Sequence, residues 1–204
     1  MKMLKFIVGV IVASGLTMPI FAQEPKQQLM QKLQQLQSFS AKFEQVVVDA
    51  QDNVVHEAAG SIALAQPNNL RWHTTDPDEI LLIANGESVY QIDYFVEQVS
   101  IISQSDAVNN NPMMLLTSTE QSDWEQFNVT LLDNGFEIIA KEQGPISSLT
   151  LVFENDLLTS IRSLDSQEQE SQLVFSDQIQ NKPLSLAIFE PSMPAGFIID
   201  DQRP

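Results

Sequence analysis

Cysteine is absent from all 204 residues of the chain. Disulfide bonds, thiolate metal sites and thiol nucleophiles are therefore excluded, because each requires a cysteine sulfur. A lipid-modified cysteine at the start of a mature chain is excluded for the same reason. If the chain is exported, it is expected to be released without a lipid anchor.

Basic residues are scarce: 10 Lys and Arg stand against 27 Asp and Glu, which gives a formal net charge of −17. Nucleic-acid phosphates and anionic lipid head groups both repel such a surface, so neither is an expected partner. Solubility alone is a second explanation for the acidity, and the composition does not choose between the two.

The N-terminal segment has the order of a secretory signal peptide. Lys2 and Lys5 precede an almost continuously apolar stretch that ends at Ile20, and the small residue Ala22 follows. We therefore predict a cleaved leader at residues 1–22 and a single domain at residues 23–204. A membrane anchor is the alternative, but the apolar run is too short and has no basic flank on its far side.

One short amphipathic helix is predicted between Pro25 and Ser38. Leu29, Leu33 and Leu36 lie at spacings i, i+4 and i+7 with Gln and Lys between them, and Pro25 suits the first helical position. A helix of about three turns is marginal alone, so its leucine stripe needs a surface to cover.

The remaining sequence alternates with a period of two and predicts a mainly β (α+β) protein. Asn85-Gly86, Asn134-Gly135 and Asn155-Asp156 indicate tight hairpin turns. Because every connection is short, we expect ten or eleven strands in antiparallel meander order with no parallel crossover. The predicted strands cover residues 39–50, 54–65, 69–75, 79–84, 87–93, 97–103, 127–133, 136–142, 148–154, 157–165, 171–180 and a short tail strand at 197–199.

A strongly bent antiparallel sheet has a concave apolar face. Helices either fill it, which makes an ordinary core, or only lid it, which leaves a ligand cavity. The sequence pattern alone favours the core. The apolar run from Met113 to Leu116, which follows a predicted helix start at Pro112, has the same two interpretations. Methionine adapts to irregular surfaces and suits a promiscuous pocket, but such runs more often belong to a core.

Motifs for catalysis or metal binding are few. The chain has two histidines, and His56-Glu57 begins like the HExxH zinc motif but ends in Gly60, so the second ligand is missing. Nucleophile elbows, Walker loops and dinucleotide fingerprints do not occur. The carboxylate clusters are typical of solvated turns. We predict no enzyme, no metal and no cofactor.

Several segments share a specific spacing with a known family. They are QPNNLRWHTTDPDEILLIANG (66–86), YFVEQ (94–98), SDWEQFNV (122–129), IDDQR (199–203) and FSAKFEQ (39–45) after the first helix. Together they resemble, in order and over essentially the whole mature chain, the bacterial outer-membrane lipoprotein carrier family, LolA. The resemblance implies a half-open antiparallel β-barrel with a lid of short α-helices over an apolar cavity.

The resemblance also implies a function. Such carriers receive acylated lipoproteins from an inner-membrane ABC transporter, hide the acyl chains while crossing the periplasm, and deliver them to an outer-membrane receptor. They act as monomers. A same-fold periplasmic protein that binds other lipids or senses lipoproteins is the alternative. The same-fold receptor is excluded because it needs an acylated cysteine.

Residues of the expected site follow from the same resemblance. Trp72 should line the cavity under the lid, unless it is a plain core tryptophan, and Leu70 takes a lid or partner-contact position where relatives often have Phe. Family members commonly carry, before Pro67, an Arg that latches the lid through helix carbonyls; Gln66 stands here, and we expect a looser lid. The predicted cavity and lid residues are Leu29, Leu33, Leu36, Phe43, Leu70, Trp72, Leu82, Met113, Met114 and Leu116.

Overall fold

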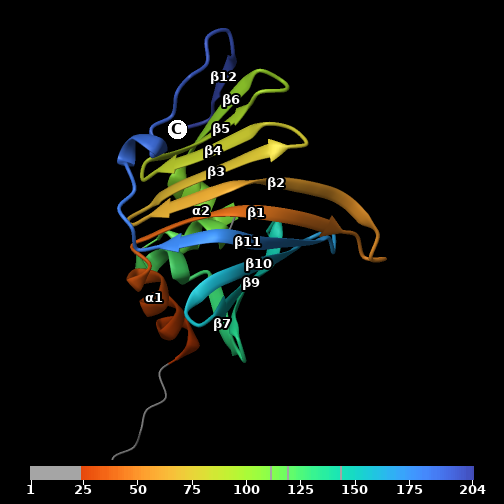
Figure 1. Cartoon of the computed structure of the whole chain (residues 1–204), viewed down its shortest axis with the longest axis vertical. Coiled ribbons are helices and arrows are strands. Elements are labelled where there is room, and N and C mark those ends of the chain that lie inside the picture. The colour runs from red at the N-terminus through yellow and green to blue at the C-terminus, as the bar shows by residue number, and fades with distance from the viewer. Residues whose placement is uncertain (1–23, 111, 119, 143) are drawn as a thin grey trace, which may run out of the picture.

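The computed structural model describes residues 24–110, 112–118, 120–142 and 144–204, so the predicted leader lies outside the described residues. Twelve strands of this part of the chain form one curved sheet, with short helical segments against it (Figure 1). The strands are β1 (Ser38–Val48), β2 (Val54–Ala65), β3 (Asn69–Asp76), β4 (Ile80–Asn85), β5 (Ser88–Asp93), β6 (Gln98–Ser103), β7 (Phe127–Leu132), β8 (Gly135–Ala140), β9 (Ile146–Glu154), β10 (Leu157–Asp165), β11 (Glu170–Gln180) and β12 (Ile198–Asp201). The helical segments are α1 (Pro25–Gln35), α2 (Gln104–Asn110), η1 (Pro112–Leu116), η2 (Gln121–Trp124) and η3 (Leu186–Phe189).

The strand order is β12-β6-β5-β4-β3-β2-β1-β11-β10-β9-β8-β7, so the sheet is open and two meanders meet where β1 pairs with β11. The predicted mainly β architecture is confirmed. The expectation of a purely antiparallel sheet was wrong in one place, because β12 pairs with β6 in parallel. The C-terminal segment reaches that edge by a long path outside the sheet, which the assumption of short connections did not allow.

Two of the three predicted hairpin turns lie where the sequence indicated them. The third is shifted by one residue, because Gly135 pairs with Leu132 as the first residue of β8 and Asp133 and Asn134 make the turn. Gly86 has φ +96° between β4 and β5, a conformation that side chains with a Cβ rarely adopt. Asn155 and Asp156 both have positive φ between β9 and β10, as the favoured two-residue hairpin turn requires.

The concave face carries the main core. Alternating residues Phe39, Ala41 and Phe43 of β1 point into it, and the ring of Phe39 meets that of Phe175 on β11 edge to face at 5.4 Å. The leucine stripe of α1 is buried in the same cluster, with Leu29 and Leu33 at most 2% exposed. The helical segments therefore cover this face: α1 contacts β7, η1 contacts β9, and α2 contacts β5 and β6.

The C-terminal segment covers part of the convex face. Phe189 of η3 packs against Ala63 and Ala65 of β2, and Phe197 packs against the outward side of β4 to β6. Arg203 then binds Asp201 through two nitrogens and donates to Ser88 Oγ at 3.2 Å. Its hydrogen bonds lower the pKa of Asp201 to about 2. The tail is thus held by both packing and charge.

Gly60 is the tightest point of the central sheet. A Cβ at this position would overlap the backbone carbonyl of His73 on β3 and come within 2.9 Å of the Phe43 ring. Only glycine allows β2 to pass this close to its neighbours.

Among the residues that the structure describes, no helix combines the length and the apolar character needed to cross a membrane.

A lidded cavity on the concave face

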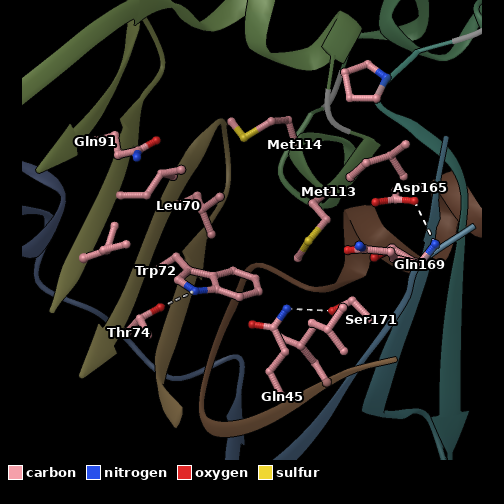
Figure 2. Close-up of a pocket in the computed structure, with 17 residues that line it drawn as sticks. Gln45, Leu70, Trp72, Thr74, Gln91, Met113, Met114, Asp165, Gln169 and Ser171 are labelled. Carbon is pink, nitrogen blue, oxygen red and sulfur yellow. Dashed lines mark hydrogen bonds between the residues drawn. The ribbon is translucent and has the colours of Figure 1, made fainter. Parts of the chain in front are cut away.

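A cavity of about 510 Å³ lies between the concave face of the sheet and η1 (Figure 2). Its volume falls within the roughly 300–1,000 Å³ of ligand sites. Strands β1, β3, β4, β5, β9, β10 and β11 contribute to the wall. The described lining residues are Gln45, Val47, Leu70, Trp72, Thr74, Ile80, Leu82, Gln91, Met113, Met114, Pro145, Ile146, Ser163, Asp165, Gln169, Ser171 and Leu173.

One side of the cavity, formed by β3, β4 and β5, is mainly apolar. Trp72 lies on β3 with its ring 4.8 Å from that of Phe43, and its Nε1 donates to Thr74 Oγ1 at 3.2 Å. This hydrogen bond satisfies the indole nitrogen, so the apolar face of the ring is available to the cavity. Leu70 and Leu82 extend the same wall, and Met113 lies across from it in Figure 2.

The opposite side carries five of the seven polar lining residues, interspersed with Val47, Pro145, Ile146 and Leu173. Gln45 on β1 donates through Nε2 to Ser171 Oγ on β11 at 2.6 Å. Asp165, the last residue of β10, and Gln169, in the turn that follows, lie near this pair in Figure 2. An elongated ligand with an apolar body and a polar end matches such a division.

A second cavity of about 360 Å³ adjoins the first and shares Leu82, Gln91 and Met114 with it. Val89, Ile102 and Ala107 add apolar wall towards α2. The concave face therefore has two neighbouring, mainly apolar spaces that share three lining side chains.

The turn between β2 and β3, residues 66–68, holds the lid; we call it the anchor turn. Gln66 Nε2 lies 3.4 Å from the carbonyl oxygens of both Leu33 in α1 and Leu116 in η1. Asn68 donates its N–H to Thr117 O at 3.0 Å, and its carbonyl accepts from Gln104 Nε2 of α2 at 2.9 Å. All three helical segments of the lid are thus bound to one turn.

Two lysines fix the outer side of α1. Lys26 Nζ donates to Trp124 O at 2.8 Å, and burial, aided by Lys141, lowers the pKa of Lys26. Lys32 pairs with Asp156 in the β9–β10 turn, and its hydrogen bond lowers the pKa of that carboxyl. These contacts tie α1 to the half of the sheet that the anchor turn does not reach.

The structure divides the predicted site residues into two groups. Leu70, Trp72, Leu82, Met113 and Met114 line the cavity. The other five lie in the adjoining main core: Leu29, Leu33, Leu36, Phe43 and Leu116. Contact between a ligand and the residues of either group stays a prediction. The apolar run after Pro112 serves both purposes, since its methionines face the cavity and its leucines are buried.

The sequence did not predict the polar residues of the cavity, such as Gln45 and Ser171. Gln45 and Ser171 are 126 residues apart, and only the pairing of β1 with β11 brings them together. No local pattern distinguishes them from solvent-facing strand residues. The alternation that places Phe43 on the concave face places Gln45 there too, and this was the one available signal.

The described part of the chain contains no group of three or more His, Cys, Asp or Glu side chains able to hold a metal ion. His73 Nε2 instead lies 2.9 Å from Glu79 Oε1 on the surface.

A family model described as outer membrane lipoprotein carrier protein LolA matches residues 34–192. The chain belongs to the LolA family. It is 36% identical to the outer-membrane lipoprotein carrier protein of Idiomarina loihiensis over 180 residues, which cover 88% of this chain and 89% of the relative. Identity to the carrier protein of Pseudoalteromonas translucida is 35%, over 98% of this chain and 95% of that one.

Solved structures support the fold. A LolA superfamily protein of Nitrosomonas europaea superposes with a TM-score of 0.52 at 13% identity, over 83% of this chain and 99% of that one. An uncharacterized conserved protein of Thermus thermophilus gives 0.53 at 12% identity, over 87% and 99%. At this identity the likeness concerns the arrangement of the sheet alone.

Gln66 allows a direct test of the anchor turn. Its two bonds to helix carbonyls are long, and its own Oε1 is buried without a hydrogen-bond partner. Gln66→Arg should supply more and stronger donors to the same carbonyls, because guanidinium carries five N–H groups and a charge. We expect hydrogen exchange of peptides covering α1 and η1 to slow about tenfold. Gln51→Arg, in the exposed β1–β2 turn, controls for charge; equal exchange rates in the two variants would contradict the latch.

Proposed function

We propose that the protein carries lipoproteins by enclosing their acyl chains in the cavity beneath the lid. The observation that supports this most is the lidded, mainly apolar cavity in a chain that belongs to the LolA family. Relatives of nearly equal length are named outer-membrane lipoprotein carrier proteins. The protein is accordingly a non-enzymatic transport protein.

The physical need for a carrier is large. Burial of a methylene is worth about 0.8 kcal/mol, so one chain of roughly fifteen methylenes costs about 12 kcal/mol to expose to water. Three chains would triple this cost and make spontaneous transfer between membranes negligibly slow. The carrier must offer a similar apolar surface and still release its load, which suits walls of half-buried and flexible side chains such as Met113 and Leu82.

The route belongs to the proposal as well. We place the protein in the periplasm, in agreement with the predicted leader, as a monomer. It would take lipoproteins from an inner-membrane lipoprotein-releasing ABC transporter and pass them to an outer-membrane receptor. The acidic surface would keep the carrier from adhering to anionic head groups of either membrane.

Native mass spectrometry tests the proposal. The full chain is expressed with export to the periplasm, purified without detergent, and analysed intact and after proteolysis. We expect one acylated lipoprotein per carrier, identified by the mass of its acylated N-terminal peptide. Free lipid alone would favour the general lipid-binding alternative, and a preparation free of any acyl chain would overturn both.

A further inference from the structure

The polar side of the main cavity holds a single charged side chain. Of the described residues that line the cavity, all except Asp165 are uncharged. Figure 2 shows the Asp165 side chain at the cavity wall beside Gln169 and near Met113. No basic side chain among these lining residues offsets its charge.

The turn that contains Asp165 does not require a charge. Oδ1 accepts the backbone N–H groups of Gln167 at 2.7 Å and Gln169 at 2.8 Å, which closes the turn between β10 and β11. Asparagine offers the same acceptor oxygen and serves such turns equally well. The turn explains the acceptor oxygen of Asp165 but not its negative charge. That charge lies at the cavity wall, where it acts on any ligand.

We infer that the polar side of the cavity is a head-group subsite for an uncharged polar head, and that Asp165 excludes acyl chains that end in an anion. Gln45, Ser163 and Ser171 supply amide and hydroxyl groups suited to ester or amide linkages. Free fatty acids and anionic phospholipids would place a negative charge beside Asp165. This inference rests on the proposed function, since it specifies which acylated molecules the cavity accepts.

Repulsion between Asp165 and an anionic head group is large enough to favour uncharged ligands over anionic ones. Two like charges about 6 Å apart, at a dielectric between those of a protein surface and water, change affinity by roughly tenfold. Both membranes that the carrier would visit are rich in phospholipid. A cavity filled by anionic membrane lipid could not bind lipoprotein. By excluding such lipids, the charge of Asp165 would keep the cavity free for acyl chains of lipoproteins.

Three amphiphiles of equal chain length test the filter: decanoate, its glycerol monoester and decyltrimethylammonium. Binding to the delipidated full chain is measured at pH 8 by competition with a fluorescent acyl probe. Wild type should prefer the monoester to decanoate by at least about tenfold at equal chain length, and added salt should narrow the gap by screening. Asp165→Asn should raise decanoate affinity about tenfold, lower that of the cation, and leave the monoester within about twofold.

Asp49→Asn is the matched control. Asp49 Oδ1 accepts the N–H groups of Gln51 and Asn53, both at 2.9 Å, in the turn between β1 and β2, and it does not line the cavity. The substitution removes the same charge and keeps the oxygen that accepts both backbone N–H groups; it gives up only the contact of Asn53 Nδ2 with Oδ2 at 3.0 Å. An equal gain in decanoate affinity in both variants, or no gain in Asp165→Asn, overturns the filter while leaving lipoprotein carriage intact. Failure of all three amphiphiles and of lipoprotein to bind wild type would instead overturn the proposed function.

Discussion

Replacing Leu82 by glutamate should abolish lipoprotein carriage while the protein still folds. Leu82 lies on β4, opposite Trp72 and Gln91 on the neighbouring strands, and lines both cavities. A carboxylate there must lose its water whenever an acyl chain fills the space, and the apolar wall is interrupted in the same place. We expect affinity for acylated lipoprotein to fall at least about a hundredfold, an effect of about 2.7 kcal/mol. The amount of lipoprotein that copurifies with the variant measures it.

Ile139→Glu provides the comparison. Ile139 follows the buried Ile138 on β8, so it points to the opposite face of the sheet, and it is 37% exposed. It adds the same charge outside the cavity and should leave lipoprotein binding unchanged. If both variants lose lipoprotein equally, the loss comes from charge or folding and the cavity is not the binding site.

Gly60→Ala should destabilise the whole sheet. Its added methyl group would overlap the backbone carbonyl of His73, and a backbone atom in a central strand has little room to move. We expect a loss of about 3 kcal/mol in the free energy of unfolding, which for a domain of this size lowers Tm by about 10 °C. Thermal unfolding followed by circular dichroism measures it.

Gly144→Ala is the control for Gly60, because a Cβ at Gly144 meets no atom within 4 Å. It should change stability by no more than about 1 kcal/mol, in either direction. Equal Tm values for the two variants would mean that β2 and β3 move apart easily. The tight packing at Gly60 would then contribute nothing to the free energy of unfolding.

Much of the fold could be predicted from the sequence because its signals are local. Alternation placed β2 at residues 54–65 and β10 at 157–165, the same bounds that the structure shows, and Asn85-Gly86 indicated the β4–β5 turn. Pairings between distant segments left no such signal. The junction of β1 with β11 and the parallel docking of β12 depend on the path of the chain in space.

The candidate site likewise combines features that the sequence predicted with features that it could not predict. The family resemblance placed Trp72 and Leu82 among the cavity and lid residues and Leu70 at a lid or partner-contact position; in the structure all three line the cavity. The pattern alone favoured a filled core, and it could not reveal a cavity, because a cavity is what side chains from seven strands and η1 fail to fill. Gln66 is a second example of a feature that the sequence predicted only in part. Gln66 Nε2 lies 3.4 Å from a carbonyl of α1, but the anchor turn also uses the backbone N–H and carbonyl of Asn68, which a substitution of Gln66 leaves in place.

The junction of β1 with β11 has a consequence for the time at which the protein can fold. Residues 126 positions apart must meet before the two meanders become one sheet, and closing so long a loop is slow compared with forming the hairpins on either side. A chain synthesised from its N-terminus therefore keeps its first meander without a partner until β11, near the C-terminus, has been made. The strand order that shapes the concave face thus makes completion of the sheet one of the last steps of folding.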